Sequence, residues 1–272
     1  MTAIIACVDD SEARTGVAHY AIWASKQLQQ PVHFLHVLDK QRYPQAPDSA
    51  TTDNELTTLD VKRAELGWQQ GEALLEEAQQ LAQAENIDSD TIQRHGRLPE
   101  CVSMQAAGSP LVVIGKKGSD SKPGQFIGSQ LENVIRTINN PVLVAAPEFS
   151  QPRKALIAYD NSPTAKKVIQ FVANSRLLKG CELHLMMVGQ SSGDNAALLN
   201  QVCETLRGAG FSVHANLQQG DVEALLLSYQ KKHCIDLFVM GAYGHSRIRN
   251  FIVGSTTIQM MQETELPLLL LR

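Results

Sequence analysis

The sequence predicts an α/β protein built from two tandem domains, each a parallel sheet with helices on both faces. Its 272 residues are enough for two domains of common size. Short apolar runs alternate with longer segments of helical periodicity, which is the order found in parallel sheets. The third observation is that the second part of the chain repeats the first.

The repeat is visible at two places in each copy. Residues 4–11 read I-I-A-C-V-D-D-S and residues 155–162 read A-L-I-A-Y-D-N-S, so each is an apolar run followed by Asp and Ser. Further along, residues 111–115 match residues 237–241, and both runs end in Gly. Motifs that recur in the same order indicate duplicated structural units.

The two copies meet at a short polar link near residues 149–153, which predicts domains 1–149 and 154–272. Because the link is short, we expect the domains to pack against each other. The first copy has extra residues between its second and fourth strands, and we assign them to the polar stretch 41–66.

The elements of the first copy follow from apolar runs, helical periodicity and turn residues. Val17, Tyr20, Ala21 and Ala24 share one face of the first helix, and Ser11 is expected to cap that helix. We expect strands at 3–8, 31–38, 89–95, 110–114 and 142–146, and helices at 12–29, 59–85, 99–107 and 129–138.

The second copy repeats this order. Its expected strands are 154–159, 182–188, 212–218, 237–240 and 268–271. Several strands are continuous apolar runs, as in parallel sheets buried on both faces. Ligands of such sheets bind beyond the carboxyl ends of the strands, which directs attention to the turn after strand one and the loop after strand four.

The loop after strand four carries the pattern G-x-x-G-x9-G-[ST] in both copies. It comprises Gly115, Gly118, Gly128 and Ser129 in the first copy, and Gly241, Gly244, Gly254 and Ser255, followed by Thr256, in the second. Glycines let the backbone approach a ligand closely, and backbone N–H groups at the start of the next helix suit a phosphate. The alternative is that these glycines only build turns and helix caps.

The loop is neither of the common phosphate-binding fingerprints, since G-x-x-x-x-G-K-[ST] and G-x-G-x-x-G are both absent. Basic side chains near the loops could add positive charge for an anion. These are Lys116 and Lys117 in the first copy and His245, Arg247 and Arg249 in the second.

Together with the strand-one Asp turn and the closing Pro-containing strand, this loop resembles the universal stress protein family, and the two copies cover essentially the whole chain. The resemblance implies a Rossmann-like fold of the adenine nucleotide alpha hydrolase type, with strand order 3-2-1-4-5 in each domain. It also implies binding of ATP or AMP, and leaves open whether Mg²⁺ binds with the nucleotide.

By the same resemblance, Asp9 and Asp160 would approach the adenine and ribose, and the backbones of Val37 and Val188 would meet the adenine. The alternatives are that each Asp stabilises a turn and each Val is a core residue. The second loop keeps a small and basic character, whereas the first contains Pro123 and follows Ser129 with Gln130. We therefore expect the C-terminal domain to be the main nucleotide site.

Composition and spacing exclude several other classes of protein. The net charge of -4 and pI near 6.1 argue against a nucleic-acid binder, and no apolar run approaches the about 20 residues that span a membrane. The N-terminus lacks the basic region of a signal peptide. Five scattered cysteines indicate reduced thiols in a cytoplasmic protein, with Cys7 in the core and Cys101 and Cys234 partly exposed on helices.

Histidine spacing gives no metal site; His33 and His184, at equivalent places in strand two, are expected on the face of the sheet. No catalytic residues are predicted. The expected function is nucleotide binding in stress response or signalling, and the alternatives are a ligand-independent scaffold with degenerate sites or a slow ATPase. For assembly we expect an internal pseudo-dimer of the two domains, with a homodimer of chains also open.

Overall fold

The computed structural model describes residues 2–40, 43, 58–118, 129–242 and 255–272. The first half of the chain alternates strands and helices as predicted. Its elements are β1 (Ile4–Cys7), α1 (Arg14–Leu28), β2 (Val32–Asp39), α2 (Thr58–Ala84), β3 (Ser89–Gly96), α3 (Leu98–Gln105), β4 (Val112–Gly115), α4 (Ser129–Thr137) and β5 (Val142–Ala145).

The second half repeats the same order of elements. They are β6 (Lys154–Ala158), α5 (Pro163–Asn174), β7 (Glu182–Val188), α6 (Gly193–Gly208), β8 (Ser212–Gln218), α7 (Val222–His233), β9 (Leu237–Gly241), α8 (Ser255–Glu263) and β10 (Leu268–Leu271). β7, β8 and β10 have the bounds expected from the sequence. The α/β fold class with two repeated halves is confirmed.

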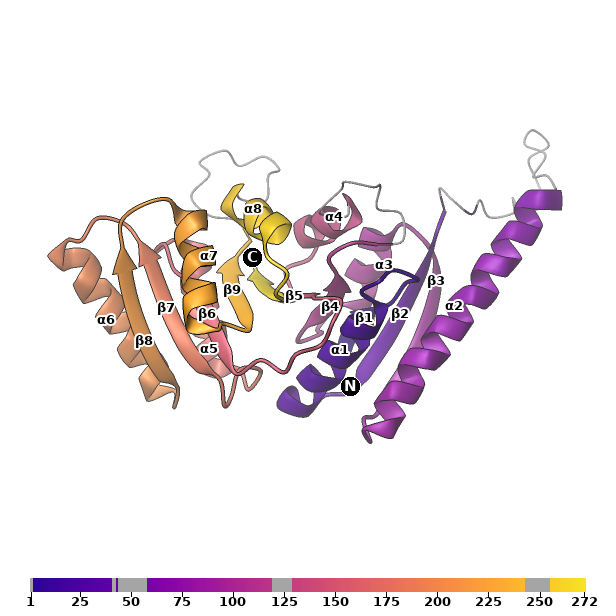
Figure 1. Cartoon of the computed structure of the whole chain (residues 1–272). Coiled ribbons are helices and arrows are strands. Elements are labelled where there is room, and N and C mark those ends of the chain that lie inside the picture. The colour runs from indigo at the N-terminus through magenta and orange to yellow at the C-terminus, as the bar shows by residue number, and fades with distance from the viewer. Residues whose placement is uncertain (1, 41–42, 44–57, 119–128, 243–254) are drawn as a thin grey trace.

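Among the described residues, the strands form one 10-stranded sheet in the order β3-β2-β1-β4-β5-β10-β9-β6-β7-β8. Within each half the order is 3-2-1-4-5 and all neighbours are parallel, as the family resemblance implied. The halves join where β10 pairs antiparallel with β5, Leu269 lying opposite Leu143. In Figure 1 the second half, in orange to yellow, lies beside the first, in indigo to magenta, and the C-terminus lies near this junction.

The inner strands are buried on both faces, so neighbouring residues of one strand enter different cores. The edge strands β3 and β8 are partly exposed. Phe34 packs on the face of α1 and α2, and Leu35 packs on the face of α3 and α4. In the second half Leu185 and Met186 make the same division between the α5–α6 and α7–α8 faces. Each core layer therefore runs across both halves of the sheet.

The first helices of the two halves begin differently. Ser162 caps α5, because its Oγ accepts a hydrogen bond from Ala165 N at 3.1 Å. The predicted cap by Ser11 is wrong: α1 begins at Arg14 with Ala13 as the N-cap residue and no side-chain cap. The Ser11 hydroxyl is instead buried without a hydrogen-bond partner. Two more residues separate this Ser from its helix, which moves the hydroxyl out of reach of the free N–H groups.

The extra residues of the first half lengthen α2. It has 27 residues, against 16 in α6 of the second half. In Figure 1 its N-terminal end projects beyond the sheet, and Leu66 on this part is 66% exposed. Part of the stretch 41–66 thus forms helix rather than loop.

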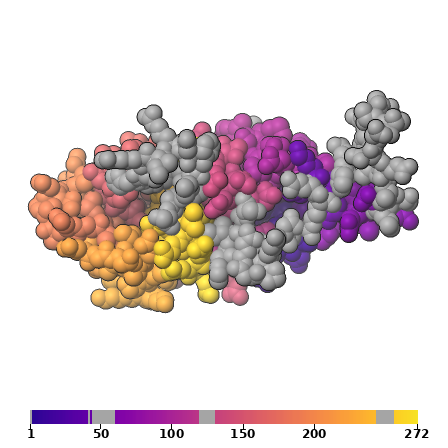
Figure 2. Space-filling view, turned by 90° about the horizontal axis from the view of Figure 1, so that it is seen from above, coloured from indigo at the N-terminus to yellow at the C-terminus, as the bar shows by residue number. Residues whose placement is uncertain are grey.

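Among the described residues, three side-chain hydrogen bonds also join the halves. Lys116 Nζ donates to the carbonyl of Thr264 at 2.6 Å, and Arg176 donates to Gln29 at 2.7 Å. The guanidinium of Arg272 donates to the carbonyl of Arg136 in the last turn of α4. Figure 2 shows the two halves in contact along a single elongated body. Two of these cations lie at the ends of helices α4 and α8, where a positive charge is favourable.

Candidate functional site

The candidate site lies at the carboxyl ends of the first and fourth strands of each half. β1 pairs with β2 on one side and β4 on the other, and Cys7 lies opposite Ile114. β6 lies in the same way between β7 and β9. The direction of the strand order reverses at these strands, and such a reversal opens a crevice where ligands bind in open parallel sheets.

The first half brings two of the predicted site residues together. A Cβ placed on Gly118 would lie 3.2 Å from Oδ2 of Asp9. The turn after strand one and the loop after strand four therefore meet at one point. Asp9 Oδ1 also accepts a hydrogen bond from Ser11 N at 3.1 Å.

Asp160 makes the same local turn in the second half. Its Oδ1 accepts from Ser162 N at 3.0 Å, and Asn161 between them has a left-handed φ of 60°. Both aspartates thus stabilise strand-to-helix turns, as the structural alternative expected. A ligand role for them remains a prediction.

The glycines that end the fourth strands make room for a helix. A Cβ on Gly115 would lie 3.0 Å from the Cβ of Ala13 near the start of α1. At Gly241 it would lie 2.8 Å from Cγ2 of Thr164 in α5. Close packing of helix on strand explains both glycines without a ligand.

The remaining predicted residues that the structure describes lie near the same end of each sheet. Val188 is the last residue of β7, whereas Val37 lies within β2, and both are partly buried. Ser129 and Ser255 are the first residues of α4 and α8, as expected, and Thr256 follows in the first turn of α8. Gly128, Gly244 and Gly254 lie outside the described residues, as do His245, Arg247 and Arg249.

We call the carboxyl-end crevice of each half its mouth. The two mouths differ at the start of the last helix of each half, α4 or α8. In the first half Gln130 Nε2 donates to Oδ2 of Asp39 at 3.3 Å, which ties α4 to the end of β2. Thr256 takes the place of Gln130 in the second half and is much smaller. The neighbouring Thr257 donates its hydroxyl to the carbonyl of Gly241 at 3.0 Å, which fixes α8 to β9. The hydrogen bond from Gln130 to Asp39 therefore crosses the first mouth. At the same place the second mouth has only the short side chain of Thr256.

That Lys116 adds charge to the first loop stays a prediction; in the described residues it contacts the other half. Its ammonium group binds the carbonyl of Thr264 in the other half. Burial lowers the pKa of Lys116, and the charge of Lys117 lowers it further, while Glu265 opposes them. This lysine serves the contact between the halves.

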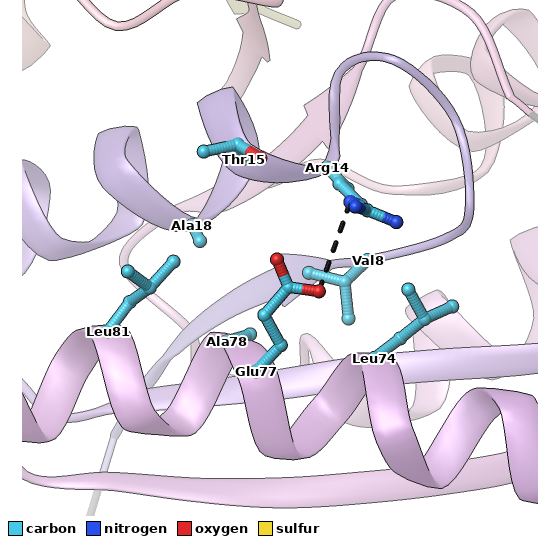
Figure 3. A pocket seen from close by; sticks show the side chains of 8 residues that line it. All are labelled: Val8, Arg14, Thr15, Ala18, Leu74, Glu77, Ala78 and Leu81. Carbon is cyan, nitrogen blue, oxygen red and sulfur yellow. Dashed lines mark ion pairs between the residues drawn. The ribbon is translucent and has the colours of Figure 1, made fainter.

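A small cavity lies elsewhere, between α1 and α2 (Figure 3). Figure 3 shows Leu74, Glu77 and Leu81 on α2 directed toward α1, with Glu77 3.9 Å from the guanidinium of Arg14. The cavity volume of about 10 Å³ is close to what one water molecule needs. It is far too small for a nucleotide and lies on the opposite face of the sheet from α4.

Other chemistries find little support in the described part of the chain. No three His, Cys, Asp or Glu side chains there are arranged to hold a metal ion. Nor does a helix within it have the length and apolar character to cross a membrane. Burial raises the pKa of the Cys7 thiol to about 12 and that of Cys181 to about 11, so neither is a reactive thiolate. Cys101 is buried, not partly exposed, whereas Cys234 is exposed.

One group of polar residues escaped the sequence analysis. A group of titratable side chains, which we call the histidine cluster, lies on one face of the second half. Its members are Glu182 and His184 on β7, His214 on β8, and Tyr229 and His233 on α7. The spacing of Glu182 and His184 puts them on the same side of a strand. Only the pairing of β7 with β8 and the position of α7 add the other members, and sequence spacing does not reveal these.

Comparisons with known proteins agree with the duplicated fold. The profile of the Universal stress protein family matches residues 1–146 and 188–272. Universal stress protein Slr1230 of Synechocystis sp. is 32% identical over 288 aligned positions that cover 100% of both chains.

Two solved structures have a similar fold. A universal stress protein from Archaeoglobus fulgidus has a TM-score of 0.76 at 20% identity, covering 99% of this chain and 98% of that one. A protein of unknown function from Pseudomonas aeruginosa PAO1 has a TM-score of 0.64 at 16% identity, covering 100% and 92%. From its sequence match along both halves, the chain belongs to the universal stress protein family.

Proposed function

We propose that the chain binds an adenine nucleotide, ATP or AMP, mainly at the carboxyl end of the second sheet, and acts in stress response or signalling. The observation that carries the proposal is the meeting of the strand-one turn with the strand-four loop, which in the first half brings Gly118 beside Asp9. The second half has the same reversal of strand order at β6, so the proposal places its ligand beside Asp160 and the end of β9.

The residues of the second mouth fit an anionic ligand. α8 begins at Ser255, directly after the loop, so its first N–H groups face the crevice end of the sheet. Thr256 adds a hydroxyl there, and Asp160 supplies a carboxylate for a ribose hydroxyl or for Mg²⁺. The first mouth is the weaker site in this proposal because Gln130 reaches across to Asp39.

The same proposal covers the organisation of the molecule. Domains 1–149 and 154–272 form an internal pseudo-dimer through β5 and β10, in a cytoplasmic protein that is not a dedicated enzyme. The antiparallel pairing of the two fifth strands supports the pseudo-dimer. A homodimer of whole chains would need a different surface.

Calorimetric titration of the purified chain with ATP, ADP and AMP, with and without Mg²⁺, tests the proposal. Because Asp160 and Asp9 are equivalent, Asp160→Asn and Asp9→Asn form a matched pair. We expect Asp160→Asn to weaken binding by about tenfold, corresponding to about 1.4 kcal/mol, and Asp9→Asn to change it little. No heat of binding with any nucleotide would favour the ligand-independent scaffold instead.

Exchange of the residues that distinguish the mouths gives a second test. Thr256→Gln introduces the longer side chain of the first mouth into the second, and we expect weaker binding. Gln130→Thr removes the bond to Asp39, and we expect binding at the first mouth to strengthen. Loss of binding in Gln130→Thr with no effect of Thr256→Gln would assign the site to the first half.

A further inference from the structure

The histidine cluster ties α7 to the outer strands of the second half. His184 is 4% exposed and uses both ring nitrogens: Nε2 lies 2.8 Å from Oε1 of Glu182, and Nδ1 lies 2.9 Å from the hydroxyl of Tyr229. The carboxylate can only accept, so Nε2 carries the proton. Nδ1 is then the acceptor, and the buried Tyr229 hydroxyl is its donor.

The cluster reaches solvent at the edge of the sheet. β8 is the last strand in the sheet, and His214 on it is stacked on His184 at a ring distance of 5.1 Å. The His214 side chain is 56% exposed, and its Nε2 lies 3.4 Å from Oε1 of Glu182. Protons can therefore reach the group from the β8 side without any opening of the core.

A lysine and further titratable side chains surround His184. Lys154 on β6 lies 4.0 Å from the Glu182 carboxylate and also donates to the carbonyl of His233 at 3.4 Å. The His233 ring lies 5.5 Å from that of His184 and stacks on Tyr229 at 4.0 Å. The facing charged and titratable groups are thus Glu182, Lys154, His214, Tyr229 and His233, with one carboxylate among them.

We propose that the histidine cluster is a pH-sensitive latch, which holds the C-terminal turns of α7 on the sheet while His184 is neutral and releases them in mild acid. Protonation turns Nδ1 from an acceptor into a donor, so the Tyr229 oxygen can only accept from it. The hydroxyl hydrogen of Tyr229, which is buried, is then left without a partner in the cluster. Protonation also puts a new positive charge beside His214, His233 and Lys154. Both effects act on α7, because Tyr229 and His233 belong to it.

The direction of the pH effect follows from burial. Burial lowers the pKa of His184, the hydrogen bond and charge of Glu182 oppose the shift, and His214 and His233 add to it. For Glu182, burial acts to raise the pKa, but the hydrogen bond from His184 and the neighbouring cations hold it below its usual value. With the pKa of His184 lowered in the closed state, the stabilisation is complete above the unfolded value of about 6.5 and is lost as the pH falls toward and through the closed-state value.

Hydrogen–deuterium exchange of the full chain tests the latch, with rates corrected for the intrinsic effect of pH. We expect the amides in the last turns of α7 to lose protection between about pH 7.5 and about pH 5.5, by roughly fivefold for one buried hydroxyl donor left unpaired. α3, which holds the corresponding place in the first half, should keep its protection. Equal protection of α7 at both pH values overturns the proposal.

Three variants separate the latch from general acid sensitivity. His184→Gln should remove the pH dependence of α7 protection, whereas Glu182→Gln should enlarge it, because the opposing carboxylate is gone. His33→Gln, the matched control on β2, should leave the α7 effect as in the wild type. A pH effect that persists in His184→Gln, or shrinks in Glu182→Gln, contradicts the proposal.

Histidine NMR of the unmodified protein gives a test that needs no variant. The His184 ring should titrate with a midpoint below about 6.5, and the amide shifts of α7 should follow the same midpoint. A midpoint above that value, or α7 shifts that do not follow it, overturns the proposal. Nucleotide binding enters none of these tests, so the latch stands or fails independently of the proposed function.

Discussion

At the scale of single residues, Gly241 is assigned both a role in ligand binding and a role in helix packing. In the proposed function it opens the phosphate-binding loop, but its backbone also allows α5 to approach β9. A Cβ there would lie 2.8 Å from Cγ2 and 3.1 Å from Cβ of Thr164. Rotation of Thr164 about χ1 cannot move its own Cβ, so the second contact persists.

Gly241→Ala therefore tests the packing role. We expect a loss of about 1–3 kcal/mol in the free energy of unfolding, because an added methyl group forces α5 outward. The measurement is urea denaturation followed by circular dichroism. Gly208→Ala is the control: Gly208 lies in α6 with nothing within 4 Å of its Cβ position, and alanine should stabilise the helix by about 0.5–1 kcal/mol.

An unchanged stability of Gly241→Ala would mean that α5 has room to spare. The glycine would then be explained by the loop alone. Because the two Gly→Ala changes are expected to have opposite signs, a general effect of adding a methyl group cannot explain both results.

At the scale of elements, the first helices of the halves show how one side chain sets a helix start. Ser162 accepts from Ala165 N and caps α5, while Ser11 at the equivalent place caps nothing. We expect Ser162→Ala to destabilise the protein by about 1 kcal/mol, within a range of about 0.5–2 kcal/mol. Ser11→Ala should be neutral or slightly stabilising, since it removes a buried hydroxyl without a partner.

Thermal unfolding of both serine variants beside the wild type measures this difference. Equal destabilisation by the two changes would show that Ser11 also caps its helix in solution. A larger effect at Ser11 would contradict the assignment of Ala13 as the N-cap residue.

The strands and helices themselves were largely predictable from sequence. Apolar runs predicted β7 and β10 to the residue, because burial on both faces leaves a clear pattern. β8 is a partly exposed edge strand, and its bounds were predicted from the order of the repeat. Helix starts were less predictable: the repeat D-x-S suggested the same cap twice, yet α1 begins two residues further on. The first turn of a helix also depends on tertiary packing, which the local D-x-S motif does not reveal.

The sequence predicted where the candidate site lies but not the side-chain contacts within and around it. The strand order was implied by the family resemblance. The meeting of Asp9 and Gly118 agrees with the expectation that ligands bind after strands one and four. The bond from Gln130 to Asp39 joins elements far apart in sequence, as does the one from Lys116 to Thr264. The histidine cluster was missed for the same reason, since pairing of β7 with β8 brings His214 to His184.

At the scale of the whole molecule, the continuous sheet predicts that the halves unfold together. Both core layers span the junction, and β5 pairs with β10 inside the sheet. Both tryptophans, Trp23 and Trp68, lie in the first half, so their fluorescence reports that half alone. A change in the second half should therefore alter the tryptophan signal if unfolding is cooperative.

Leu156→Ala provides this test. Leu156 is fully buried in β6, and its truncation should remove about 2–5 kcal/mol of stability. We expect the tryptophan and circular-dichroism transitions in urea to shift together. Leu66→Ala, at a site that is 66% exposed, should move neither by more than about 0.5 kcal/mol. A tryptophan midpoint that stays in place while the circular-dichroism curve splits would show that the halves are independent.

The antiparallel pairing of β5 with β10 also bears on how the two halves came to differ. When two such strands belong to one polypeptide, each meets its mate at a high effective concentration, whatever the abundance of the protein. Neither half then needs to remain compatible with a copy of itself. The halves differ in this way: Gln130 bonds to Asp39 in the first half, and the proposed latch lies at the outer edge of the second. Because the two halves are covalently linked, each can carry a different site within the same repeated fold.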